Sequence, residues 1–247
     1  MIARLTEGLP PRALALLLAF ALAMAVAPFF ASDYVLSVLI ISLYFAFVGQ
    51  AWNLMLGFAG QLSLGHALFV GIGAYTSAAL FTHFGVSPWA GVVAAVALST
   101  LMGCIIGYLG FRFSIRGVYF ALLTIAFAEF TGIMVDNNAW LGGSAGLFLP
   151  VKNAGSIDLL NLPDQPTLFY YMILILTVAT LVLCRFLLNS KLGLYWQAIR
   201  DDQEAAEATG VPLFRYKMIA VAISSALTGI AGVWYAFYYN NLYPEST

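Results

Sequence analysis

Solid runs of apolar residues dominate the chain and alternate with short polar segments. The most continuous runs are Ala13–Phe30, Pro88–Phe111, Gly117–Val135, Leu168–Leu188 and Met218–Tyr239. Each reaches or approaches the roughly 20 residues that a helix needs to cross about 30 Å of hydrocarbon. Strands of a membrane barrel would instead alternate apolar and polar residues over about ten positions. The pattern therefore predicts an all-α, polytopic helical membrane protein.

Two further apolar stretches, Tyr34–Phe58 and Leu62–Phe81, are interrupted by polar residues and glycines. The polar residues are Gln50, Asn53, Gln61, Ser63 and His66, and the glycines are at positions 49, 57, 60, 65, 71 and 73. Such interruptions predict spans with a broken or closely packed middle. We therefore expect about seven transmembrane helices in one domain over residues 1–247, with a re-entrant or broken segment near residues 57–66.

The composition supports membrane insertion and excludes other classes of protein. Hydrophobic residues make up 62% and charged residues 9% of the 247 residues, whereas soluble domains contain about 25% charged residues. So few charges cannot cover a surface in water, and the same numbers exclude intrinsic disorder. The net charge is −1 and basic residues form no stripe, so nothing indicates nucleic acid as a partner.

The basic residues predict the orientation, because Lys and Arg favour cytoplasmic loops. Seven spans that start inside leave Lys152 outside and place nine basic residues inside: Arg4, Arg12, Arg112, Arg116, Arg185, Lys191, Arg200, Arg215 and Lys217. The N-terminus is then cytoplasmic, residues 136–166 form an external loop, and residues 189–216 form a cytoplasmic loop. A cleaved signal peptide is the alternative interpretation of the N-terminal stretch.

The cytoplasmic segment 189–216 is the long polar stretch of the chain. Asp201 or Asp202 can cap a helix, alanines and glutamates follow, and Gly210 with Pro212 ends it. This pattern predicts a short helix of about two turns. Its small residues would allow close docking into a groove of another protein. An amphipathic linker that rests on lipid headgroups is the alternative.

Few residues that could take part in proton transfer, metal binding or disulfide formation lie inside the predicted spans. Glu129 lies within an apolar run, and an acid in a membrane is by default a functional candidate, with a hydrated or structural role as the alternative. His66 has no second metal ligand at helical spacing. Cys104 and Cys184 fall in different spans and are interpreted as packing residues. Gly103-x-x-x-Gly107 is interpreted as a packing face within the chain.

Motifs of catalysis are missing from the sequence. It contains no Gly-x-x-x-x-Gly-Lys-Ser/Thr loop, no Gly-x-Ser-x-Gly elbow and no His-Glu-x-x-His. The chain is therefore not expected to be an enzyme, and it is not expected to bind ATP through such a loop.

Several segments resemble known transporters. Glu204-Ala205-Ala206-x-x-x-Gly210 resembles the EAA loop of ABC importer permeases. The segments that look like branched-chain amino acid permeases of the LivM type are 57–69, 71–75, 116–124, 142–147 and 224–232. Together they carry the resemblance from about residue 35 to residue 245.

The resemblance implies the membrane-spanning subunit of an ATP-driven importer for branched-chain or related amino acids, in the bacterial inner membrane. The implied partners are two ABC ATPase subunits, a second permease subunit, an external substrate-binding protein and the lipid bilayer. The chain itself is expected to bind no cofactor, since ATP and Mg²⁺ belong to the ATPase subunits. The residues implied in coupling are Arg200, Asp201, Glu204, Ala205, Ala206 and Gly210, and those implied in the translocation path are Asn53, Gly60, Gln61, Ser63, Gly65 and His66.

The sequence departs from the family pattern in two places. Leu141 stands where family members usually carry Thr before the Gly-Gly of the external loop. Family members also usually continue well past the position of Thr247, so the chain is expected to be short at its C-terminus. Two alternative functions are a gradient-driven secondary carrier of small polar solutes, in which Glu129 and His66 would be linked to protons, and a urea or amide ABC permease.

Overall fold

The computed structural model describes residues 11–149 and 166–244, with side chains from residue 19 onward. The helices of the described part are α2 (Pro11–Val26), α3 (Asp33–Asn53), α4 (His66–Phe84), α5 (Pro88–Arg112), α6 (Val118–Asp136), α7 (Pro166–Leu188), α8 (Lys191–Asp201), α9 (Gln203–Ala208) and α10 (Leu213–Tyr239). The shorter elements are the turns η1 (Ala27–Phe29), η2 (Leu54–Phe58), η3 (Ala139–Leu141) and η4 (Gly143–Ala145), and the strands β1 (Leu147–Phe148) and β2 (Asn241–Leu242).

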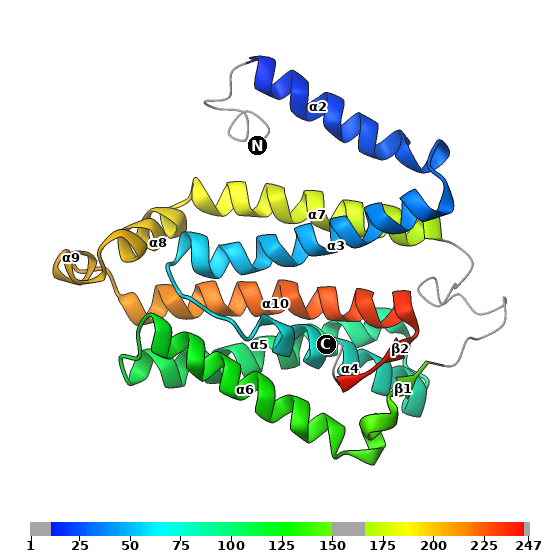
Figure 1. Cartoon of the computed structure of the whole chain (residues 1–247). Helices are drawn as coiled ribbons and strands as arrows, with labels where there is room; N and C mark the ends of the chain where they lie inside the picture. Colours follow the sequence, from blue (N-terminus) through cyan, green and yellow to red (C-terminus); the bar gives the residue numbers. More distant parts are fainter. Residues whose placement is uncertain (1–10, 150–165, 245–247) are drawn as a thin grey trace.

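Six helices of the described part are long and apolar enough to cross a membrane: α3 continued by η2, α4, α5, α6, α7 and α10. The predicted first span, Ala13–Phe30, falls on α2 and η1, where Ala19–Phe29 is a shorter apolar helix. Figure 1 shows α2 standing apart from the other helices, which lie side by side. The prediction of a polytopic helical membrane protein is confirmed.

The connections between helices gather at two ends of the bundle (Figure 1). One end carries the turn at residues 113–117 together with α8 and α9. We term it the basic end, because Arg112, Arg116 and Arg200 lie there. The opposite end carries η3, η4 and the two strands, which pair antiparallel with Leu147 opposite Leu242. The turn at residues 113–117 and the segment 189–216, which are both expected in the cytoplasm, therefore lie at the same end of the bundle.

The predicted external loop at residues 136–166 is described only in part. Its first part forms the turns η3 and η4 and then β1, as the cluster of glycines at 142–146 indicates. Lys152 and the two prolines Pro150 and Pro163 lie outside the described residues. Pro166 begins α7.

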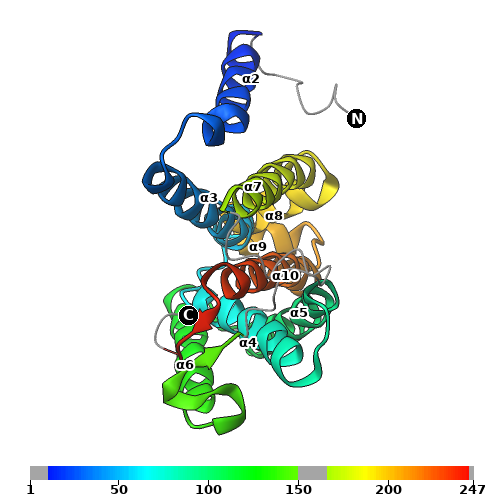
Figure 2. The ribbon, with the colours of Figure 1, turned by 90° about the vertical axis from the view of Figure 1, so that its right-hand side faces the viewer.

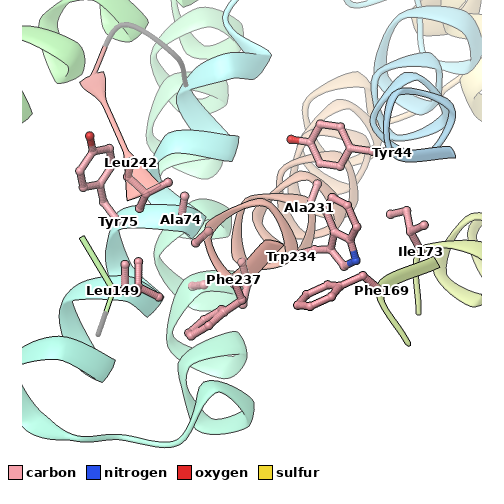
Figure 3. Packing of buried hydrophobic residues seen from close by; sticks show 14 of the residues in the cluster. Tyr44, Ala74, Tyr75, Leu149, Phe169, Ile173, Ala231, Trp234, Phe237 and Leu242 are labelled. Atoms are coloured by element: carbon pink, nitrogen blue, oxygen red, sulfur yellow. The ribbon is translucent and has the colours of Figure 1, made fainter. Parts of the chain in front are cut away.

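Helix α10 lies at the centre of the bundle, between α3 and α7 on one side and α4 and α5 on the other (Figure 2). Figure 3 shows Trp234 of α10 between Tyr44 of α3 and Phe169 of α7. The Trp234 ring stacks on Tyr44 at a centroid distance of 5.3 Å and meets Phe169 edge-on at 6.0 Å. On the other side Phe237 meets Phe81 of α4 edge-on at 5.5 Å. Aromatic rings thus hold α10 against neighbours on both sides.

Small residues bring the backbone of α10 directly against α4 and α5. A Cβ atom at Gly232 would collide with the carbonyl oxygen of Val70, and one at Gly73 would collide with that of Gly229. A Cβ at Gly229 would lie 2.7 Å from the hydroxyl of Ser99 on α5. Close approach through glycine is a main source of helix association in lipid, where the hydrophobic effect between helices is missing.

The Gly103-x-x-x-Gly107 face also packs within the chain. A Cβ at Gly103 would lie 2.5 Å from the hydroxyl of Ser225, and one at Gly107 would lie 3.1 Å from the sulfur of Met218. Both neighbours belong to α10. The interpretation of this motif as packing within the chain is confirmed.

Replacing Gly232 by Val is expected to destabilise the bundle, because the added side chain must push α10 away from the α4 backbone. Overpacked cores lose about 1–3 kcal/mol or more. The measurement is unfolding of the purified protein in mixed detergent and SDS. Gly49→Val is the matched control, since no described atom lies within 4 Å of its Cβ position. Equal stability of the two variants would contradict the packing argument.

Candidate functional site

The backbone leaves the helical conformation between α3 and α4. After Asn53 the helix widens into one π-helical turn, η2, and residues 59–65 then run without helix until α4 begins at His66. Figure 1 shows this connection running from the basic end into the bundle. We term residues 54–65 the broken segment. The predicted break near residues 57–66 is confirmed, whereas the predicted span Leu62–Phe81 is helical only from His66.

Side chains from other helices replace the missing helical hydrogen bonds of the broken segment. The backbone N–H of Leu64 donates to the hydroxyl of Thr124 on α6 at 3.1 Å. The indole N–H of Trp52 donates to the carbonyl oxygen of Ser63 at 2.7 Å. A Cβ at Gly65 would collide with the carbonyl oxygen of Thr124. These contacts explain why helix α4 starts late, because the preceding backbone groups already have partners.

His66 forms a buried hydrogen-bonded node with two other helices. Its Nε2 lies 3.0 Å from the hydroxyl oxygen of Ser224 on α10, and that hydroxyl donates to the carbonyl oxygen of Ala51 on α3 at 2.6 Å. Since a serine hydroxyl has one hydrogen, Nε2 of His66 must donate to it. Nδ1 then carries no proton in the neutral ring, and this buried atom has no partner among the described residues.

The candidate path residues differ in exposure. Among the six, the exposed residues are Asn53 and Gly60, and the buried ones are Gln61, Ser63, Gly65 and His66. The amide of Gln61 donates to the carbonyl oxygen of Ala59 at 2.8 Å. A cavity of about 300 Å³ lies at the basic end between α9, α10 and the 113–117 turn, and none of the six lines it. In this conformation most of the candidate path residues therefore shape the break rather than face open space.

The predicted two-turn helix of the basic end is α9, and Asp202 is its cap. The Asp202 carboxylate accepts hydrogen bonds from the backbone N–H groups of Glu204 at 2.9 Å and Ala205 at 3.0 Å. Gly210 ends the helix with a φ of +86°, a conformation that favours glycine. Asp201 instead ends α8 and pairs with Arg200 at 3.0 Å. Of the two caps that the sequence left open, the structure selects Asp202.

The surface of α9 is polar on one side and packed on the other. Glu204 and Ala205 are exposed, whereas Ala206 is buried. Glu204 lies 3.5 Å from Arg116, and its side chain is 84% exposed. Such an exposed pair adds little stability. Glu204 and Ala205 therefore remain accessible on the surface of α9.

Helix α8 anchors this region to the membrane bundle, and it is a separate helix that the polar pattern of segment 189–216 did not predict. Its Trp196 is fully buried in one hydrophobic cluster with Leu54 and Ala59 of the broken segment. The indole N–H of Trp196 donates to the carbonyl oxygen of Tyr216 at 2.8 Å. The signal in the sequence is an apolar series at helical spacing: Leu192, Trp196 and Ile199.

Arg200 connects the candidate coupling residues to the broken segment. Its guanidinium donates from Nη1 to the carbonyl oxygen of Gly57 at 2.8 Å. Gly60 has a φ of +66°, and its Cβ position lies 3.0 Å from the Cα atom of Arg200. A side chain at position 60 would therefore be strained and would crowd α8. The structure thus brings together two groups of residues that the sequence places far apart.

The described part of the chain contains neither a disulfide nor a cluster of metal ligands. Cys104 in α5 and Cys184 in α7 are free thiols. The described residues contain no group of three or more His, Cys, Asp or Glu side chains that could hold a metal ion.

Comparison with known proteins identifies related permeases. The profile of the family described as "Branched-chain amino acid transport system / permease component" matches residues 34–247. The high-affinity branched-chain amino acid transport system permease protein LivM of Escherichia coli (strain K12) is 30% identical, over 91% of this chain and 58% of that protein. The same permease of Salmonella typhimurium (strain LT2) gives the same values.

A probable branched-chain amino acid transport permease protein LivM of Methanocaldococcus jannaschii is 22% identical, over 79% of this chain and 65% of that protein. The chain thus spans less than two thirds of the length of the curated relatives that it matches. No solved structure matches the chain significantly.

The hydrogen-bonded node predicts one tautomer for His66. Nitrogen NMR of a sample with labelled histidine, in a His83→Gln background that leaves His66 as the single histidine, should show protonated Nε2 and bare Nδ1. Ser224→Ala should remove this preference and destabilise the protein by about 1–3 kcal/mol, because a buried donor loses its acceptor. Ser225→Ala is the control, since the hydroxyl of Ser225 bonds only within α10. A dominant Nδ1–H tautomer in the unchanged node would contradict the assignment.

Proposed function

The chain belongs to the family of branched-chain amino acid transport permease components, and from this membership we propose that it is the membrane-spanning subunit of an ATP-driven ABC importer for branched-chain or related amino acids. One observation carries the coupling part of the proposal. The exposed helix α9 follows α8 directly, and α8 is fixed to the broken segment through Trp196 and Arg200. A movement imposed on α9 would therefore reach the broken segment.

The partners follow from this assignment. Two ABC ATPase subunits bind ATP and Mg²⁺ and carry out hydrolysis, so this chain contributes no catalytic residue. A second permease subunit completes the membrane part, and an external binding protein delivers the amino acid. The protein lies in the bacterial inner membrane with its N-terminus in the cytoplasm, because basic loops favour that side. The basic end then faces the ATPases.

The coupling residues take distinct parts in this mechanism. Glu204 and Ala205 contact the ATPase, Ala206 seats α9 on its own subunit, and Gly210 ends the helix so that it stays short. Asp201 holds the guanidinium of Arg200. Arg200 passes the movement to the carbonyl of Gly57.

The broken segment borders the translocation path. Backbone that leaves the helix inside a membrane is tolerated where it is packed in protein or lines a cavity. Such breaks near the middle of a bundle form substrate sites in many transporters. Asn53 and Gly60 are exposed and border the path, whereas Gln61, Ser63, Gly65 and His66 set the shape of the break. Alternating access then requires the break to shift when α8 moves.

A gradient-driven carrier is the second candidate, and the exposed Glu129 favours it. In that mechanism the carboxyl group of Glu129 would exchange protons during transport. The carrier mechanism gives no role to α9. A urea or amide ABC permease would use the same α9 but another substrate.

Energy dependence separates the importer from the carrier. In cells that contain the natural full-length protein and its partner subunits, depletion of ATP should lower uptake of labelled leucine by about tenfold or more. Collapse of the proton gradient with ATP maintained should leave uptake nearly unchanged. Uptake that survives ATP depletion and stops with the proton gradient would reject the importer.

Two variants at the basic end should fail in different ways. Glu204→Lys reverses the charge of an exposed residue on α9, so it should reduce copurification of the ATPase subunits. Arg200→Ala leaves that surface unchanged, so copurification should persist while ATP-driven uptake falls about fivefold or more, the scale of common coupling energies. Lys191→Ala on α8 is the control and should change neither quantity. Normal uptake by Arg200→Ala would contradict the coupling route.

A further inference from the structure

Glu129 lies near the middle of α6 and points away from the bundle. Its side chain is exposed, and no hydrogen bond or ion pair is found for it among the described residues. Apolar residues surround it at helical spacing, and Leu122 and Ile133 are 55% and 60% exposed. An acidic group therefore stands alone in the centre of an apolar helix face.

Helix α6 lies at the edge of the bundle, so this face borders whatever surrounds the chain. Figures 1 and 2 show α6 at the edge opposite to α2. Only 17% of the most apolar 18-residue stretch of α6 is buried inside the structure, whereas the corresponding share is 56% for α4 and for α10. Acidic residues in membrane helices almost always face protein or a water-filled cavity, because a carboxylate in hydrocarbon loses its hydration. The Glu129 face is therefore not a lipid-facing surface in the working protein.

Gly132 leaves open space beside Glu129 on α6. It lies one turn after Glu129, and no described atom lies within 4 Å of its Cβ position. In contrast, Gly73, Gly103 and Gly229 each contact a neighbouring helix. A glycine inside a helix is unfavourable unless something must approach closely. Nothing within the described chain approaches Gly132, so the space beside Glu129 is open to a group from outside the described residues.

We propose that the face of α6 around Glu129 and Gly132 lines a water-filled passage toward the second permease subunit, and that the Glu129 carboxylate binds the ammonium group of the translocated amino acid. This inference rests on the proposed function. The ligand class is an α-amino acid with an aliphatic side chain. Its positive ammonium group meets the carboxylate, and its side chain meets the apolar surface of Leu122 and Ile133. Gly132 leaves room for the backbone of the ligand.

Thiol labelling tests the passage without requiring transport. In the natural full-length protein in its membrane, with Cys104 and Cys184 replaced by Ser, Gly132→Cys should react with a water-soluble, membrane-impermeant maleimide. Excess L-leucine should slow this reaction. Met134→Cys is the matched control, because Met134 lies within one turn of Gly132 and is 57% exposed, but residues two positions apart point to nearly opposite sides of a helix. Equal, slow reaction of both cysteines would overturn the passage.

Uptake then tests the carboxylate. Glu129→Gln should lower leucine uptake at saturating ATP by about tenfold or more, whereas Glu129→Asp should stay within about threefold of the natural protein. Copurification of the ATPase subunits should be unchanged. Full uptake by Glu129→Gln would overturn the role of the carboxylate. If uptake in the natural protein follows the proton gradient instead of ATP, the importer fails, while leucine protection of Gly132→Cys still supports the site.

Discussion

The contact between the backbones of α10 and α4 is the constraint on which the rest of the structure depends. Gly232 and Gly229 on α10 leave no room for side chains against Val70 and Gly73 of α4. Helices in lipid gain little from the hydrophobic effect, so such close contacts decide which helices associate. Because α10 is held this tightly, Ser224 reaches His66 at the first residue of α4. The packing of α10 thereby fixes the position at which the helix resumes after the break.

The same arrangement joins the break to the basic end of the molecule. Trp196 of α8 packs in one cluster with Leu54 of the broken segment, and Arg200 holds the carbonyl of Gly57. The loss of helical hydrogen bonding near Gly57 is what leaves carbonyl groups available to a side chain from another element. The broken segment and the exposed helix α9 are therefore parts of one connected unit. This connection is the physical basis on which we propose coupling in this chain.

Local patterns in the sequence were sufficient for the six long apolar helices and for α9, whereas the predicted first span at Ala13–Phe30 contains only the shorter apolar helix Ala19–Phe29. Continuous apolar runs determine the long helices, and a capping aspartate with a later glycine determines α9, since both signals act within a few residues. The start of α4 was predicted too early, because Thr124, which is distant in sequence, takes the backbone N–H of Leu64. The contact of Arg200 with Gly57 spans 143 positions, and no local pattern contains it. The exposure of Glu129 likewise depends on where α6 packs.

The central claim is that α9 seats in an ABC ATPase subunit. A photo-crosslinking amino acid at Ala205, which is exposed, tests this claim directly in native membranes that contain the natural full-length protein. The account predicts a crosslink to an ATPase subunit, and a much weaker one from the buried position Ala206. Crosslinks from Ala205 to lipid alone would contradict the account and would make α9 a helix that rests on the membrane surface.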